Sequence, residues 1–108
     1  MVPLEAAVLT AGLDLRSEGQ PEFHGFLLAK AIRANDHARG LTAHETLYKA
    51  LDRMERMGLL ESRWEAPDIA AAAGRPRRRL YRVTGQGERA LDDAREVAMA
   101  RSTERELA

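Results

Sequence analysis

Residues 42–65 read TAHETLYKALDRMERMGLLESRWE, and this stretch contains a helix start, a helix stop and the first residues of a strand. Thr42 and Glu45 have the spacing of a capping box, in which each side chain accepts a backbone N–H at the helix start. Gly58 ends the helix. Between these ends the apolar side chains recur with the helical period, and they are Leu47, Ala50, Leu51, Met54 and Met57. The stretch therefore predicts an amphipathic helix with one buried and one polar face.

After Gly58 the pattern changes to the two-residue period of a strand. Leu60, Ser62 and Trp64 alternate with charged residues, so Trp64 is expected to lie in the core beside Leu60. A second alternation covers 79–83. The intervening residues 67–76 are too many for a tight turn, and they predict a flexible hairpin tip.

The flanking segments predict three further helices. Apolar residues at helical spacing follow Pro3 as far as Ser17, and a second apolar face covers 21–33. Thr84 is a candidate N-cap for a last helix that reaches about Ser102. The order helix, helix, helix, strand, strand, helix predicts a mostly α-helical α+β fold of the winged helix-turn-helix type.

The length of 108 residues suits one domain. We expect residues 1–108 to divide into an N-terminal helix at 1–18, a helix-turn-helix with its wing at 20–84, and a C-terminal dimerisation helix at 85–108.

The charge is segregated along the chain, although 17 basic and 17 acidic residues cancel overall. Five arginines fall between Arg75 and Arg82 without one acid. Clustered cations displace counterions from phosphates, so this stretch predicts a nucleic-acid contact through Arg75, Arg77 and Arg78. The alternative is a solvated loop with no partner. Arg79 shares the strand face of Tyr81, and we expect it to pack or pair instead.

Several separated blocks resemble the PadR family of bacterial regulators. They are His24-Gly25-Phe26, the run TLYKAL at 46–51, the run MGLLESRWE at 57–65, and GRPRRRLYRVT at 74–84 with Gly87. The resemblance covers about 21–91 and implies that the helix at 42–57 enters the DNA major groove. Its candidate DNA contacts are His44, Thr46, Tyr48 and Lys49. The resemblance also implies that the hairpin arginines grip the backbone or minor groove, and that the first and last helices form a dimer interface.

Two of these helix residues have a second interpretation. The Tyr48 hydroxyl could contact phosphate, or its ring could lie flat over the hairpin. Lys49 and Glu45 are four residues apart, a spacing that also stabilises an exposed helix without any partner.

The terminal helices carry more apolar residues than one small core needs, which indicates a homodimer. The candidate interface residues are Leu4, Val8, Leu15, Leu91, Ala94 and Ala98.

Other classes of protein receive little support. The chain has no cysteine, and His24, His37 and His44 lack the spacing of a zinc site. We find neither a phosphate-binding glycine loop nor a catalytic residue set, so the sequence predicts no enzyme, no metal site and no cofactor. No apolar run is long enough to span a membrane and no signal peptide is evident, so a cytoplasmic protein is expected.

The leading hypothesis is a dimeric, sequence-specific repressor of PadR type that reads an inverted repeat in double-stranded DNA. One alternative is a winged-helix module whose arginines bind an acidic protein partner. A further alternative is a regulator that senses an unknown small-molecule effector in a pocket between the terminal helices of the dimer.

Overall fold

The computed structural model describes residues 1–35 and 44–107, with the side chains of 34, 35, 44, 45, 105 and 107 excepted. Helices and strands follow the predicted order with one addition, a short helix between the strands. Their bounds are α1 Pro3–Ser17, α2 Gly25–Asn35, α3 His44–Arg56, β1 Leu60–Trp64, α4 Pro67–Ala72, β2 Arg79–Val83 and α5 Gly85–Leu107.

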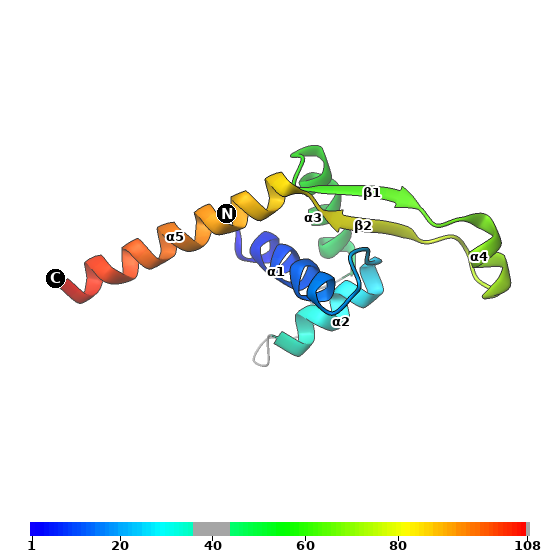
Figure 1. Cartoon of the computed structure of the whole chain (residues 1–108), viewed down its shortest axis with the longest axis horizontal. Helices are drawn as coiled ribbons and strands as arrows, with labels where there is room; N and C mark the ends of the chain where they lie inside the picture. Colours follow the sequence, from blue (N-terminus) through cyan, green and yellow to red (C-terminus); the bar gives the residue numbers. More distant parts are fainter. Residues whose placement is uncertain (36–43, 108) are drawn as a thin grey trace.

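Helices α1, α2 and α3 form the body of the molecule, and α1 also packs against β2 and α5 (Figure 1). The core between them is apolar, with Leu9, Leu28 and Leu51 fully buried. Two ion pairs hold α1 in place. The buried carboxylate of Glu5 accepts a hydrogen bond from Nε of Arg53 in α3 at 2.9 Å. Nη1 of Arg16 donates to the carboxylate of Glu88 in α5 at 2.7 Å.

Strands β1 and β2 form an antiparallel hairpin in which Leu60 lies opposite Val83 and Trp64 opposite Arg79. This hairpin and the outer part of α5 extend in opposite directions from the body (Figure 1). The molecule is therefore long, with principal extents of 60, 29 and 25 Å. Three helices, a hairpin wing and a long last helix make a winged helix-turn-helix, as predicted.

Helix α2 begins at Gly25, four residues later than predicted, because the chain before it is extended. Phe23 forms an isolated antiparallel bridge with Tyr81 of β2, with backbone N···O distances of 2.9 and 2.8 Å. Phe23 is thus buried as part of a strand-like segment and not in a first helical turn. The predicted capping box at Thr42 and Glu45 lies outside the described residues.

The prediction of a flexible tip at 67–76 was wrong, because residues 67–72 form α4. Pro67 stands at the start of α4, and its alanines favour helix. Gly74 ends the turn with φ +68°, a left-handed conformation that glycine adopts without strain.

The last helix also runs five residues beyond the predicted end at Ser102.

The placement of Trp64 in the core was also wrong, since 53% of this residue is exposed. Leu60 and Val83 at the inner end of the same hairpin face are buried, as expected. The strand alternation continues past the edge of the body, and Trp64 lies on the part that projects. The ring is therefore on the core-facing side of the hairpin but beyond the core.

The start of α5 is fixed against the end of α3 by Thr84 and Gly87. The Thr84 hydroxyl oxygen accepts the Gly87 N–H at 3.0 Å and donates to the Gly58 carbonyl at 2.6 Å, so the predicted N-cap is confirmed. Gly87 is buried, and a Cβ there would lie 3.0 Å from a Val83 methyl and closer still to the Leu59 carbonyl oxygen. Only glycine allows this approach.

Candidate nucleic-acid interface

Helix α3 turns one face to the core and the other to solvent. Leu47, Ala50, Leu51 and Met54 are buried, whereas Thr46, Lys49, Asp52 and Arg56 are exposed. Helix α3 lies beside the inner end of the hairpin (Figure 1). The exposed face of α3 and the wing are therefore adjacent. His44 begins α3, but its side chain lies outside the described residues.

Tyr48 lies at the edge of this face and is 43% exposed. Its ring and hydroxyl cover Gly25, where an added Cβ would lie 2.6 Å from Cζ of the tyrosine. The ring therefore packs against the start of α2 while part of the side chain remains exposed. For this packing, Gly25 of the His24-Gly25-Phe26 block is required to be glycine, because any side chain there would clash with the Tyr48 ring.

Arg75 is held by an acidic partner within the wing. Its guanidinium makes two hydrogen bonds to the buried carboxylate of Glu65, one of them from Nη2 to Oε2 at 2.9 Å. These bonds hold the pKa of Glu65 below its usual value and raise the pKa of Arg75. Arg75 therefore connects the two arms of the wing, a role that its predicted assignment to DNA did not include.

Arg77 and Arg78 make no ion pair with a carboxylate in the part of the chain that the structure describes. Nε of Arg77 donates to the backbone carbonyl of Glu65 at 2.7 Å, which leaves the charge of an exposed guanidinium uncompensated. Nη1 of Arg78 lies 3.3 Å from Nε2 of His24. Of the three arginines predicted to bind DNA, these two can attract a phosphate without first breaking an ion pair.

His24 joins the wing to the start of α2. Its Nδ1 accepts the backbone N–H of Leu27 at 3.3 Å, while Nε2 faces Arg78. Burial and then the positive charges of Arg78 and Arg75 lower the pKa of His24 below 6.5. Neither His24 nor Glu65 was predicted as a site residue, because only their places in the blocks that resemble PadR proteins marked them.

We predict that this arrangement makes stability depend on pH. Because the pKa of His24 is lower in the folded chain than the unfolded value of 6.5, its contribution is complete above pH 6.5 and is lost as the pH falls toward the folded pKa. Urea unfolding measured between about pH 7.5 and about pH 5 should show this loss. In the variant His24→Gln the slope over this range should be shallower, and an unchanged slope would exclude His24 as its source.

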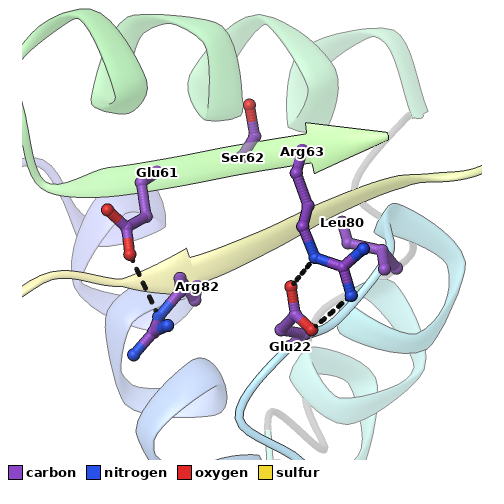
Figure 2. Close-up of a pocket in the computed structure, with 6 residues that line it drawn as sticks. All are labelled: Glu22, Glu61, Ser62, Arg63, Leu80 and Arg82. Atoms are coloured by element: carbon purple, nitrogen blue, oxygen red, sulfur yellow. Dashed lines mark hydrogen bonds and ion pairs between the residues drawn. The ribbon is translucent and has the colours of Figure 1, made fainter. Parts of the chain in front are cut away.

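Arg63 and Arg82 of the hairpin are electrostatically different from Arg77 and Arg78, as Figure 2 shows. Arg63 donates two hydrogen bonds to Glu22, at 2.6 and 2.8 Å, and Arg82 lies 3.1 Å from Glu61. The pairs line a shallow pocket of about 290 Å³, with Ser62 and Leu80 as further lining residues. Arg63 and Arg82 both have carboxylate partners, so their attraction for phosphate is weak.

The predicted interface residues of the terminal helices differ in exposure. Val8, Leu15 and Leu91 are buried in the core of their own chain, so their side chains have almost no surface to offer a partner. Leu4 and Ala94 are half-buried, and Ala98 is exposed. The outer half of α5 also exposes 51% of Val97 and 70% of Met99, two apolar residues that the prediction did not include.

Comparisons with known proteins agree with this architecture. The family model described as the transcriptional regulator PadR-like family matches residues 15–93. A transcriptional regulator from Clostridium thermocellum is 19% identical, with a TM-score of 0.70 over 95% of this chain and 87% of that one. A PadR family regulator from Clostridium difficile is 21% identical, with a TM-score of 0.64 over 95% and 98%. One from Eggerthella lenta is 25% identical, with a TM-score of 0.56 over 92% and 84%.

No curated protein matches the sequence. Within the residues that the structure describes, no helix combines the length and the apolar character needed to cross a membrane.

Proposed function

Because the chain belongs to the PadR-like family of transcriptional regulators, we propose that it represses transcription as a homodimer bound to an inverted repeat in duplex DNA. In this proposal the exposed face of α3 enters the major groove, with His44, Thr46, Tyr48 and Lys49 as its DNA contacts. The wing holds the flanking backbone through Arg77 and Arg78. Arg75 supports the wing from within and contacts DNA only at its exposed edge.

The observation that carries the proposal is the position of the two hairpin arginines that form no ion pair with a carboxylate in the described part of the chain. Arg77 and Arg78 lie just before β2, and the first residue of β2, Arg79, contacts Glu55 of α3. Arg63 and Arg82 of the same hairpin are instead paired with carboxylates. Attraction for phosphate is therefore concentrated on a part of the hairpin close to an exposed helix face. That combination of a helix for the groove and cations for the backbone is how winged-helix proteins bind DNA.

The proposal of a homodimer is supported by the outer half of α5. Val97 and Met99 are exposed there, and this outer part of α5 stands away from the body (Figure 1). Exposed apolar residues on a projecting helix are suited to pair with the same helix of a second copy. Two-fold symmetry would then present two α3 helices to half-sites about one DNA turn, or roughly 34 Å, apart.

A salt titration of DNA binding tests the proposal. Fluorescein-labelled duplexes of about 40 base pairs that tile the region upstream of the gene would be titrated at several salt concentrations between about 50 and 300 mM. One duplex should bind two chains, at least about a thousandfold more tightly than a random duplex, and its affinity should fall as salt rises. Equal affinity for all duplexes, or no dependence on salt, would contradict it.

A further inference from the structure

Trp64 is an exposed aromatic residue with a fixed position. It is the last residue of β1, and Arg79 lies opposite it in the hairpin register. The guanidinium carbon of Arg79 stands 5.1 Å from the centre of the indole ring, in the geometry of a cation–π contact. Arg79 is itself 3.6 Å from Glu55 of α3. The ring is thus tied through Arg79 to α3, although about half of it remains in water.

The side of the hairpin that carries Trp64 is the side next to α3. Ser62, two residues earlier on the same face, donates its hydroxyl hydrogen bond to Glu55. Tyr81, opposite Ser62, is buried, and its pKa is raised first by that burial and then by the negative charges of Asp52 and Glu55. Trp64 therefore lies further out along the surface that starts at α3, in the angle between this helix and the projecting arm of the wing.

The arginines around the Trp64 ring favour an anionic binding partner over an apolar protein surface. Arg77, Arg78 and Arg79 follow one another on the facing arm, and the charges of the first two have no carboxylate partner among the described residues. An indole adds an apolar face and one N–H donor to such a surface. Sugar rings and phosphate oxygens alternate along a DNA strand, so a duplex offers both complements together.

We propose that Trp64 is a DNA-contact residue, whose ring lies on a deoxyribose and whose N–H donates to a phosphate of the strand bordering the groove that α3 enters. Arg79 is the positioning residue that fixes the ring. This inference rests on the proposed function, because it needs a duplex bound across α3 and the wing. It adds an uncharged contact to the wing, whose other proposed DNA contacts are arginines.

The fluorescence of Trp64 tests the contact directly, because it is the only tryptophan of the chain. Quenching by acrylamide would be measured for the protein alone, with the tightest upstream duplex, and with a random duplex of the same length. Formation of each complex would be followed separately by the anisotropy of the labelled DNA. The upstream duplex should shield Trp64, so that the quenching constant falls when the complex forms.

Substitutions separate the ring from its positioning residue. Trp64→Ala should weaken binding about tenfold, as loss of one aromatic contact to a nucleotide does, with the salt dependence unchanged because no charge is removed. Trp64→Phe keeps a ring and should recover most of the affinity. Arg79→Gln should make the indole more accessible to acrylamide even without DNA, whereas Arg79→Lys, which keeps the cation, should not.

Each outcome supports or overturns the inference. If the complex forms and Trp64 remains as accessible as before, or if Trp64→Ala binds as tightly as the parent, the contact is excluded while the proposed function stands. If no duplex binds at any salt concentration, both fail together. Circular dichroism of each variant establishes that the fold is retained.

Discussion

Replacing Arg77 and Arg78 together by glutamine should weaken binding of the upstream duplex by about two orders of magnitude at about 0.15 M salt. In a homodimer the change removes four cations, two from each wing, none of which forms an ion pair with a carboxylate among the described residues. Each lost phosphate contact should make the slope of log K against log salt shallower by about 0.9, or between 3 and 4 in total. Fluorescence anisotropy over a salt series measures both quantities.

The matched control is the double variant Arg63→Gln and Arg82→Gln. It removes the same number of charges from the same hairpin, but at positions where Glu22 and Glu61 already neutralise them (Figure 2). Exposed ion pairs of this kind contribute little to stability, so the control should fold normally. If both double variants reduced the slope equally, the net charge of the chain would account for binding and the assignment of Arg77 and Arg78 as phosphate contacts would be wrong.

Substitution of Gly87 by alanine should destabilise the fold by about 2–3 kcal/mol, because the new Cβ has no space. Its nearest neighbour would be the backbone oxygen of Leu59, which cannot rotate away as a side chain can. Relief requires α5 to move from the turn that follows α3, with loss of the Thr84 cap. Urea unfolding of the variant and its parent, analysed as a two-state transition, measures the difference.

Gly85→Ala provides the comparison within the same helix. Gly85 is exposed, and the nearest atom to its added Cβ is the end of the flexible Arg89 side chain at 3.4 Å. Alanine there should leave stability unchanged or raise it slightly, since it favours helix over glycine. Equal destabilisation by the two substitutions would mean that the start of α5, and not the close approach to Leu59, is sensitive to a side chain.

Local signals were sufficient to predict most of the elements. Pro3 and the apolar spacing that follows it gave α1 with its observed bounds, and the alternation at 79–83 gave β2. Both signals depend only on neighbours along the chain. The resemblance to PadR proteins agreed with the family match, and it linked these elements to a DNA-binding fold.

Trp64 and α4 were missed because their environment depends on where the hairpin leaves the body. Alternation indicates which side of a strand a residue takes, but it does not indicate how far the core extends along that side. Trp64 is on the predicted side and beyond the core. The alanines of α4 were interpreted as a flexible tip, although Pro67 before them and Gly74 after them are helix-boundary residues.

The candidate site was predicted as a cluster of arginines, and the structure separates its members. Arg75 and Glu65 are ten residues apart in sequence, and the hairpin brings them together. The predicted pairing or packing of Arg79 is confirmed by its contacts with Glu55 and Trp64. The strand register determines which arginine forms an ion pair with a carboxylate. The distribution of charged residues along the sequence does not predict that register.

The bonds around Glu65 have a consequence for the kinetics of recognition. Its carboxylate holds Arg75, its carbonyl holds Arg77, and its N–H donates to the Arg78 carbonyl at 2.8 Å. Fixing a residue of a disordered loop costs about 1–2 kcal/mol in conformational entropy. Because these bonds form during folding, the wing is preorganised before it encounters DNA, and association is not slowed by a disorder-to-order step.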